Sequence, residues 1–350
     1  MSVIFLSQIF LRVGFKPVIN MLMKSTAQWK TQMPERRKMT TIDPISFNLW
    51  KTDKASFAKT LGDSFKETGF AIISDHTIAH DVIEAADEAS KKYFALDENT
   101  KRKYADPEDG FQRGHSPMGT ENAKGKKEAD LKEFWHTGRK LPANSPYRAS
   151  MKDTPSVSEV DGFDESTREL YDALDSFGAD LLRAVAIYLG LEETYFDDKV
   201  NVGNSILRLL HYPPQETPPP EGTERAGAHE DINLITLLLG AEEAGLQAKH
   251  RSGKWLDVNA PKGAVVVNVG DMLQRMTAGI LPSTTHRVLN PAPERSRFPR
   301  YSKPFFLHLN NDAVISPLES CLDMGGRGEP DITAGDYLTE RLIEIGLKKA

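Results

Sequence analysis

The stretch GAHEDINLITLLLG, residues 227–240, places a histidine and an aspartate one residue apart in front of an apolar run. In an extended chain, His229 and Asp231 point to the same side. A neutral imidazole nitrogen and a carboxylate oxygen are ligands that iron and zinc accept. The pair therefore predicts two ligands of a metal site on one strand face, although an isolated His-x-Asp is more often a hydrogen-bonded surface pair.

A third ligand must come from elsewhere in the chain, which has nine histidines. His286 is the candidate because it lies in the strand-like segment THRVLN, 55 residues after Asp231. In a jelly roll, that separation is enough for the chain to return beside its starting strand. Two histidines and one carboxylate on one face of an octahedron leave three positions open, which is the facial triad of non-haem Fe(II) oxygenases.

The first half of the chain predicts mainly helices, which would have to support such a site. Helical periodicity indicates three of them, over 56–69, 79–95 and 164–189. Gly69 would end the first helix, Asp164 would cap the start of the third, and Gly190 would close its end. A short buried strand is expected over 70–76. Residues 105–162 are rich in Gly, Pro, Asp and Lys and are interpreted as loops.

After Asn201 the sequence changes character, and short β-rich segments alternate with turns that contain Gly and Pro. These segments are SILRLLHY, NLITLLLG, GLQAKH, KWLDVN, AVVVNVG, THRVLN and KPFFLHLN. Many short strands with regular turns predict a sandwich or barrel such as a jelly roll, also called a double-stranded β-helix. We therefore predict an α+β fold with a mainly β core, in which the α-rich region 39–200 packs on a jelly-roll core, 201–350, as one unit. A last helix is expected over 333–349.

Composition narrows the class of protein. The 350 residues are 39% hydrophobic and 27% charged, which is ordinary for a globular protein. A net charge of −6 gives no general basic surface, so no nucleic-acid partner is expected. The single cysteine, Cys321, excludes an intrachain disulfide and a cysteine-based metal cluster. This usage suits a reducing cytoplasm, which is the location we predict.

The N-terminal residues 1–38 differ from the rest, with seven Lys or Arg residues and one acidic residue, Glu35. Their apolar run VIFLSQIFL is too short to cross a bilayer, so no membrane association is expected. A basic, acid-poor leader is typical of an organellar transit peptide, and import into an organelle stays open. We favour a start assigned too early, with Met33 or Met39 as the first residue, because the globular pattern begins abruptly at TTIDPISF.

The order of motifs along the chain resembles the isopenicillin N synthase-like branch of the 2-oxoglutarate/Fe(II)-dependent oxygenases. IDPISF and LGDSFKETGFAIISDHTI resemble the N-terminal region of that family, and LRLLHYPP resembles its Tyr-Pro-Pro segment. AHEDINLITLLL carries the His-x-Asp, GDMLQRMTAGILPSTTHRV leads to the distal histidine, and RYSKPFFLHLN resembles the Arg-x-Ser strand. The resemblance covers roughly residues 42–345, and these motifs in this order are highly specific.

The resemblance implies a role for six residues. His229, Asp231 and His286 would be the catalytic iron ligands, and Arg300, Ser302 and Tyr212 would hold the distal carboxylate of 2-oxoglutarate. The implied enzyme is a dioxygenase that uses Fe(II), 2-oxoglutarate and O2 to hydroxylate or desaturate a small organic substrate, with release of succinate and CO2. Arginine suits a carboxylate because its guanidinium can grip both oxygens.

Other polar residues carry weaker expectations. His115 and Trp135 fall in segments that often line substrate pockets in this family. Asn268 and Asp271 flank a predicted turn, and we assign them no chemistry.

Strand alternation gives three further predictions. Arg287 and His211 should face away from the site, and His308 should be a buried histidine with its hydrogen bonds satisfied.

The chain departs from many plant members at Leu210, where they have an asparagine, so plant substrates do not transfer. Some relatives, including isopenicillin N synthase, work without 2-oxoglutarate and keep the Arg-x-Ser pair. A bacterial relative fragments 2-oxoglutarate to ethylene. A different class, a jelly-roll binding protein with a non-catalytic metal, is the remaining alternative from the sequence.

Overall fold

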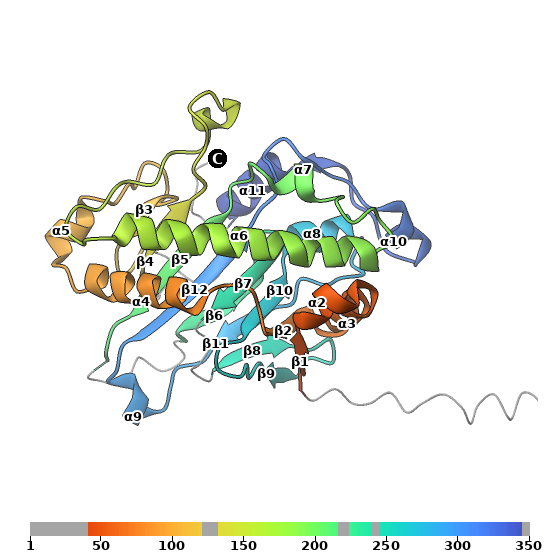
Figure 1. Ribbon diagram of the computed structural model, residues 1–350, viewed down its shortest axis with the longest axis horizontal. Coiled ribbons are helices and arrows are strands. Elements are labelled where there is room, and N and C mark those ends of the chain that lie inside the picture. The colour runs from red at the N-terminus through yellow and green to blue at the C-terminus, as the bar shows by residue number, and fades with distance from the viewer. Residues whose placement is uncertain (1–40, 121–131, 216–223, 240–244, 345–350) are drawn as a thin grey trace, which may run out of the picture. The chain divides into compact units, whose positions relative to one another are not determined.

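Two β-sheets lie behind a layer of helices in the computed structural model of the chain (Figure 1). The structure describes residues 41–120, 132–215, 224–239 and 245–344. The leader predicted over residues 1–38 lies outside the described residues, whereas Thr41–Ala350 groups into one compact unit. The predicted jelly roll with flanking helices is confirmed.

The larger sheet has eight strands in the described part of the chain. In spatial order they are β1 Pro44–Ser46, β2 Phe70–Ser74, β10 Val265–Val269, β7 Ile235–Leu239, β12 Arg300–Leu307, β5 Ile206–Tyr212, β4 Glu133–Gly138 and β3 Gly114–Ser116. All neighbours pair antiparallel except β1 and β2, which are parallel. β-Branched and leucine-rich runs such as VVVNV and ITLLL build its central strands, as expected for strands buried on both faces.

The smaller sheet has four strands within the described residues and faces part of the larger one. In spatial order they are β6 Ala226–His229, β11 His286–Val288, β8 Leu246–Lys249 and β9 Trp255–Asp257. Apolar side chains from both sheets, among them Phe70, Val266 and Leu246, form one buried cluster between them. A separate pair joins β13 Val314–Ile315 to β14 Ile332–Thr333.

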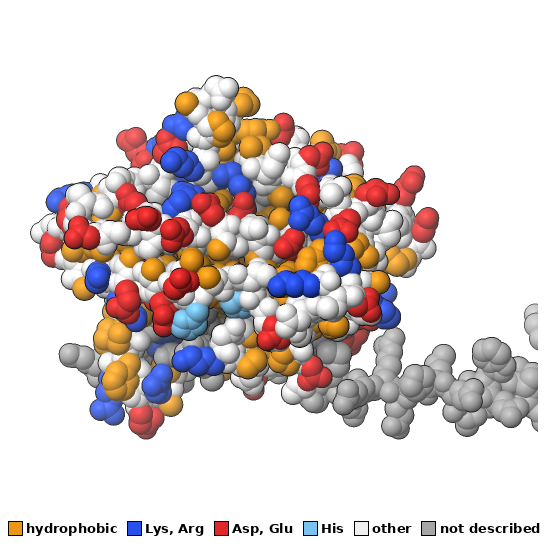
Figure 2. All heavy atoms as spheres, in the orientation of Figure 1, with side chains coloured by type: hydrophobic (Ala, Val, Ile, Leu, Met, Phe, Trp, Pro, Cys, Tyr) orange, Lys and Arg blue, Asp and Glu red, His pale blue; other side chains and the backbone are white. Residues whose placement is uncertain are grey.

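Helices cover the outer face of the larger sheet, where the long α6 runs across the strands with α3 and α4 beside it (Figure 1). The helices are α2 Asn48–Thr52, α3 Lys54–Thr68, α4 His80–Phe94, α5 Glu98–Arg102, α6 Phe163–Tyr188, α7 Asp197–Val200, α8 Asp271–Met276, α9 Pro293–Ser296, α10 Glu319–Asp323 and α11 Ala334–Glu344, with a 3-10 turn at Pro146–Ala149. Acidic and basic side chains are interspersed over this face, without a patch of one sign (Figure 2).

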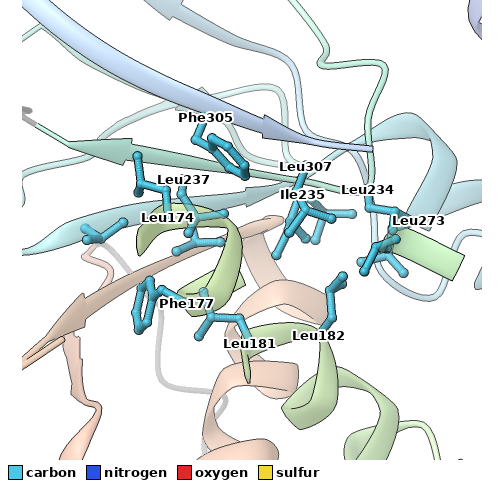
Figure 3. Close-up of a cluster of buried hydrophobic side chains, with 14 of the residues drawn as sticks. Leu174, Phe177, Leu181, Leu182, Leu234, Ile235, Leu237, Leu273, Phe305 and Leu307 are labelled. Carbon is cyan, nitrogen blue, oxygen red and sulfur yellow. The ribbon is translucent and has the colours of Figure 1, made fainter. Parts of the chain in front are cut away.

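The main hydrophobic core lies between α6 and the larger sheet. Leu174, Phe177 and Leu181 of α6 pack towards Leu237, Phe305 and other side chains of β7 and β12 (Figure 3). Burying a side chain of this size contributes about 1.5–3 kcal/mol, so this layer fixes β7 and β12 firmly. The site described below is built on the opposite face of the same strands.

The three predicted helices are confirmed with boundaries within two residues, and Gly69 ends α3 with a φ of 74° as the C-cap. Gly190 follows α6 with a φ of 73°. The predicted cap at Asp164 is wrong, because Gly162 is the N-cap residue of α6. The Asp164 carboxylate instead accepts hydrogen bonds from the Ser156 hydroxyl and the Val157 N–H, which tie the preceding segment to the helix.

The interpretation of 105–162 as loops is also wrong, because it contains β3 and β4. All six residues of β4 are buried, including Glu133 and His136. A strand buried on both faces shows no alternation of polar and apolar residues, and its polar residues are satisfied by partners distant in sequence. The composition of this segment therefore gave no indication of β4.

Candidate metal centre

Three potential metal ligands converge between the two sheets. His229 ends β6, Asp231 follows in the turn towards β7, and His286 begins β11 directly opposite His229. Asp231 Oδ1 lies 3.8 Å from the Nε2 atom of each histidine. One ligand atom from each residue lies within 4.8 Å of the others, so the group could hold a metal ion.

His229 and Asp231 do not share one strand face, which corrects the expectation from their spacing. β6 belongs to the smaller sheet and β7 to the larger one, so the pair spans the step between the sheets. The chain turns at Asp231, and the apolar run ITLLL anchors the far side of that turn in the larger sheet. The two ligands are thus held by different sheets rather than by one strand.

Hydrogen bonds to the backbone set the tautomer of both histidines. His229 Nδ1 lies 2.7 Å from the Gly227 carbonyl oxygen, and His286 Nδ1 lies 3.1 Å from that of Thr284. A carbonyl oxygen only accepts, so each Nδ1 carries a proton, and it is Nε2 that holds the lone pair in the neutral form of each ring. Both rings therefore direct Nε2, the nitrogen that a metal would bind, towards the site.

The carboxylate of Asp231 is oriented by two donors. Thr236 Oγ1 and Asn268 Nδ2 donate to Asp231 Oδ2 at 2.6 and 2.8 Å, and Asn233 Nδ2 lies 3.0 Å from the Thr236 hydroxyl. Oδ2 is thereby occupied, and Oδ1 faces the histidines. Outer hydrogen bonds of this kind fix ligand orientation in metal sites.

The assignment of Asn268 to a turn without chemistry is therefore wrong. Asn268 lies within β10, and Asp271 begins the short helix α8. One signal could have identified Asn268: it is the only polar residue in VVVNV, an otherwise apolar strand. A buried amide needs a partner, and in this case the partner is the aspartate of the triad.

Electrostatics favour the protonation states that a metal needs. Desolvation and the neighbouring His286 lower the pKa of His229 to about 4, so its ring is neutral at pH 7. Burial opposes ionisation of Asp231, but His286, His229 and the two hydrogen bonds outweigh it and hold its pKa below the ordinary value. His229 is the exposed member of the triad, which leaves the site open to solvent on that side.

The residues predicted to bind 2-oxoglutarate lie together on the inner face of the larger sheet. Arg300 and Tyr212 are direct partners across β12 and β5, and Ser302 pairs with Leu210 one step further. Arg300, Ser302 and Tyr212 are all buried. The Arg300 guanidinium carbon is 5.3 Å from the centre of the Tyr212 ring.

A second arginine that the sequence reasoning missed adjoins the same ring. The Arg225 guanidinium carbon lies 5.7 Å from the Tyr212 ring centre, and its side chain is buried. Arg225 directly precedes β6, a strand that was not predicted as a separate element.

His115 and Trp135 face the helices rather than the site, so their placement in a substrate pocket is wrong. They pair with each other across β3 and β4, and Trp135 packs on Tyr93 and Phe163 in the main core. Their neighbours on β4 alternate to the inner face.

Two other residues, His211 and Arg287, were predicted to face away from the site. His211 faces away from the site, as expected, and lies 2.8 Å from Glu133 Oε1 while stacking on Tyr301. Arg287 turns outward to Gln247 and stacks on Trp255, which confirms a structural role.

His308 is buried as expected, but its hydrogen bonds are not all satisfied. Its Nδ1 has no hydrogen-bond partner among the described residues, and burial lowers its pKa to about 4.

A cavity of about 440 Å³ lies elsewhere, between the helix side of β4 and the start of α6. Its three arginines have acidic partners within the chain: Arg139 pairs with Asp175, Arg148 with Asp153, and Arg168 lies 3.9 Å from Asp172 Oδ1. Within the described residues no helix is both long and apolar enough to cross a bilayer.

Two imidazole nitrogens and one carboxylate oxygen at the step between two jelly-roll sheets define a non-haem metal enzyme of the oxygenase type. Residues 203–309 match the 2OG-Fe(II) oxygenase superfamily, and residues 42–158 match the family described as non-haem dioxygenase in morphine synthesis N-terminal. The chain belongs to the 2-oxoglutarate/Fe(II)-dependent oxygenases, in their isopenicillin N synthase-like branch.

Known relatives are similar to this chain over most of its length. The 2-oxoglutarate-Fe(II) type oxidoreductase hxnY of Emericella nidulans is 33% identical over 81% of this chain and 83% of its own. A crystal structure of a 2OG-Fe(II) oxygenase family protein from Caulobacter crescentus is 48% identical, with a TM-score of 0.82 over 87% of this chain and 99% of that one. A full-length Neurospora crassa protein, solved in complex with alpha-KG, is 29% identical, with a TM-score of 0.76 over 88% and 97%.

These matches identify the class of enzyme that the sequence predicted. The protein is an enzyme, a 2-oxoglutarate-dependent dioxygenase that oxidises a small organic substrate, and its cofactor and cosubstrate are Fe(II) and 2-oxoglutarate.

Proposed function

We propose that His229, Asp231 and His286 hold the Fe(II) of this dioxygenase. The convergence of two Nε2 atoms and one Oδ1 atom on one point is the observation that carries the assignment. The donor set fits the metal, because the Nδ1–H groups bond the backbone and leave Nε2 of both rings for the metal, and the pKa of the Asp231 carboxylate is lowered. When bound, the iron supplies coordination sites for 2-oxoglutarate and O2 and the oxidising power for attack on a substrate C–H bond.

Arg300, Ser302 and Tyr212 are proposed to hold the distal carboxylate of 2-oxoglutarate. Arg300 and Ser302 are two residues apart on β12, so their side chains point to the same face. Tyr212 stands opposite Arg300 on β5, with its ring centre 5.3 Å from the Arg300 guanidinium carbon. A buried guanidinium grips a carboxylate strongly because neighbouring apolar groups exclude water.

Charge balance supports this arrangement. Fe(II) brings two positive charges and Arg300 one, against one negative charge on Asp231 and two on 2-oxoglutarate. A nearly neutral set lowers the cost of burying ions. The chain therefore orients the cosubstrate between the triad and Arg300, and leaves the exposed His229 side for entry of O2 and substrate.

Release of succinate from 2-oxoglutarate by the Fe(II)-loaded enzyme tests the proposal. Anaerobic addition of 2-oxoglutarate to the Fe(II) enzyme should also give a weak visible charge-transfer band. The double variant His229→Ala, Asp231→Ala should lose both signals, while the matched variant His80→Ala, Asp81→Ala, at the exposed start of α4, should keep them. Unchanged succinate release in the first double variant would refute the ligand assignment.

A further inference from the structure

The segment that leaves β12 carries a histidine on the inner face of the larger sheet. Phe305 and Leu307 point towards α6 (Figure 3), and Leu309, just beyond the strand, joins them in the main core. Phe306 and His308 alternate with these three residues. Their side chains therefore lie on the opposite, inner face.

The register of β12 places His308 beyond the metal site, on the side away from the proposed cosubstrate site. Phe306 stands opposite Thr236 of β7, whose hydroxyl donates to Asp231. His308 follows Phe306 by two residues, ~7 Å along an extended chain, whereas Arg300 precedes His308 by eight residues, or ~26 Å. A five-carbon cosubstrate bound at Arg300 cannot reach so far. His308 therefore faces the part of the interior that is left for the substrate.

The ring of His308 is buried without a hydrogen bond at Nδ1. The residue is 7% exposed, and Nδ1 has no partner within the described part of the chain. The backbone is held in place, because the His308 N–H donates to the Ser205 hydroxyl. A buried polar nitrogen without a partner lowers stability. A ligand that supplies the missing hydrogen bond removes this cost when it binds.

The charges around His308 favour an uncharged partner. Burial lowers the pKa of His308 to about 4, while the negative charge of Asp231 raises it and the positive charge of Arg113 lowers it, so the ring is neutral at pH 7. The Arg113 guanidinium is itself buried and donates to three oxygen acceptors. A ligand cation beside His308 would meet the positive charge of Arg113. A neutral imidazole also cannot offset the charge of a buried anion.

The hydrogen-bonding capacity of the ring narrows the partner further. A neutral imidazole has one N–H and one lone pair, and either can lie at Nδ1. A hydroxyl group or a primary amide both donates and accepts, so each satisfies Nδ1 in both tautomers. Phe306, two residues before His308, is half-buried and presents a phenyl ring to the same interior. That ring offers a flat apolar surface beside the polar nitrogen.

We propose that His308 is a substrate-binding residue, and that the primary substrate combines an uncharged hydroxyl or amide group, which bonds His308, with an apolar body, which packs on Phe306. This rests on the proposed dioxygenase function and names the substrate class of the same site. The hydrogen bond anchors one end of the substrate beyond Phe306. The apolar body then extends back to the level of Asp231, where the attacked C–H bond lies.

Calorimetric titration of the anaerobic Fe(II)–2-oxoglutarate enzyme with benzyl alcohol, benzamide, toluene and benzoate tests this proposal. Benzyl alcohol or benzamide should bind at least about 10-fold more tightly than toluene, which lacks the polar group, and than benzoate, which is charged. His308→Phe should abolish this preference, so that the alcohol and the amide bind no more tightly than toluene. His308→Gln should retain part of it, because an amide side chain can also donate and accept.

His115→Phe is the matched control. His115 is also a buried histidine without a hydrogen bond at Nδ1, but it faces the helices and packs on Tyr93. This variant should keep the wild-type order of affinities.

NMR of the Zn(II)–2-oxoglutarate enzyme with isotope-labelled histidine gives a second measurement, which holds even if His308→Phe folds poorly. The Nδ1 resonance of His308, identified by its loss in His308→Gln, should shift when benzyl alcohol or benzamide binds and should stay in place with toluene.

Four results would overturn the proposal: equal or absent binding of all four probes, tightest binding of benzoate, an unchanged preference in His308→Phe, or an Nδ1 resonance that no probe shifts. Loss of the preference in His115→Phe as well would also overturn it, because the effect would then come from the fold and not from the His308 ring. Failure of the dioxygenase function itself is recognised separately, because the wild type would then release no succinate from 2-oxoglutarate even without a second substrate.

Discussion

The two faces of β4, β5 and β12 treat charge in opposite ways. On the helix side, Glu133 lies 2.7 Å from Lys101 Nζ and 2.8 Å from His211 Nδ1, and Lys303 pairs with Asp87. These buried charges are neutralised by other parts of the chain. On the inner side, the same strands carry arginines against aromatic rings and no acidic residue.

Residues on the helix side of these strands therefore serve stability, whereas residues on the inner side serve ligand binding. A buried ion pair is costly to break because the remaining charge is left without a partner. The inward Arg300 has a different use, since it is proposed to bind the distal carboxylate of 2-oxoglutarate. Substitutions on the helix side should therefore change folding, whereas substitutions on the inner side should change ligand binding.

Glu133→Ala should produce the largest effect of the comparison. It would leave Lys101, which is only 4% exposed, without its buried partner, and we expect the free energy of unfolding to fall by about 3–5 kcal/mol. Urea unfolding followed by circular dichroism measures this. The double variant Glu133→Leu, Lys101→Met should recover much of the loss, because it replaces the pair with apolar groups of similar size. A Glu133→Ala protein as stable as wild type would contradict a structural role for the pair.

On the inner side, Arg300→Met should change ligand binding rather than folding. It should weaken 2-oxoglutarate binding by about 2–3 kcal/mol, a 30- to 150-fold loss, by removing charge-assisted hydrogen bonds. Titration of the anaerobic charge-transfer band gives this affinity.

Lys303→Met is the matched control on the same strand, three residues along and on the opposite face. It should lower stability and leave the affinity for 2-oxoglutarate near that of wild type. If both variants weaken binding equally, the division between the two faces does not hold.

The sequence predicted what depends on local pattern and on motif order. Helical periodicity located α3, α4 and α6, and the succession of short strands predicted the jelly roll. His229, Asp231 and His286 were predicted together because their residue types and order are specific. Arg300, Ser302 and Tyr212 were likewise predicted from the motifs around them, and the structure brings them onto adjacent strands.

What could not be predicted depends on contacts between distant segments. β4 escaped detection because Glu133 and His136 are satisfied by residues of other elements. The wrong residues of β3 and β4 were therefore chosen: His115 of β3 and Trp135 of β4 face the helices, whereas Phe134 and His136 of β4 face the interior. A register error of one residue reverses every side chain, so a strand without visible alternation gives no means of choosing its face.

Asn268→Ala tests the support behind the triad, where the two sheets meet. Loss of one of the two donors to Asp231 Oδ2 should weaken metal binding by about 10- to 100-fold. Competition with a chromogenic chelator, using Co(II) or Fe(II) under anaerobic conditions, measures the affinity without relying on turnover. Asn310→Ala is a comparison, because this buried asparagine bonds Asn201 and the Asp198 carbonyl, away from the triad, and should leave metal affinity unchanged. Equal losses in both variants would indicate a general effect on folding.

The smallest expected effect concerns His115, on the helix side of the sheet. Burial lowers its pKa to about 4, against 6.5 for an ordinary histidine. Between these values the unfolded chain binds a proton that the folded protein does not bind, so stability is complete above pH 6.5 and falls as the pH drops towards 4. His115→Phe removes this titration and fits the aromatic surroundings of Tyr93. From pH 7 to pH 5, the variant should lose about 1–2 kcal/mol less unfolding free energy than wild type. Urea unfolding at several pH values measures both slopes, and parallel slopes would show that the His115 side chain gains its proton in the folded state as readily as in the unfolded one.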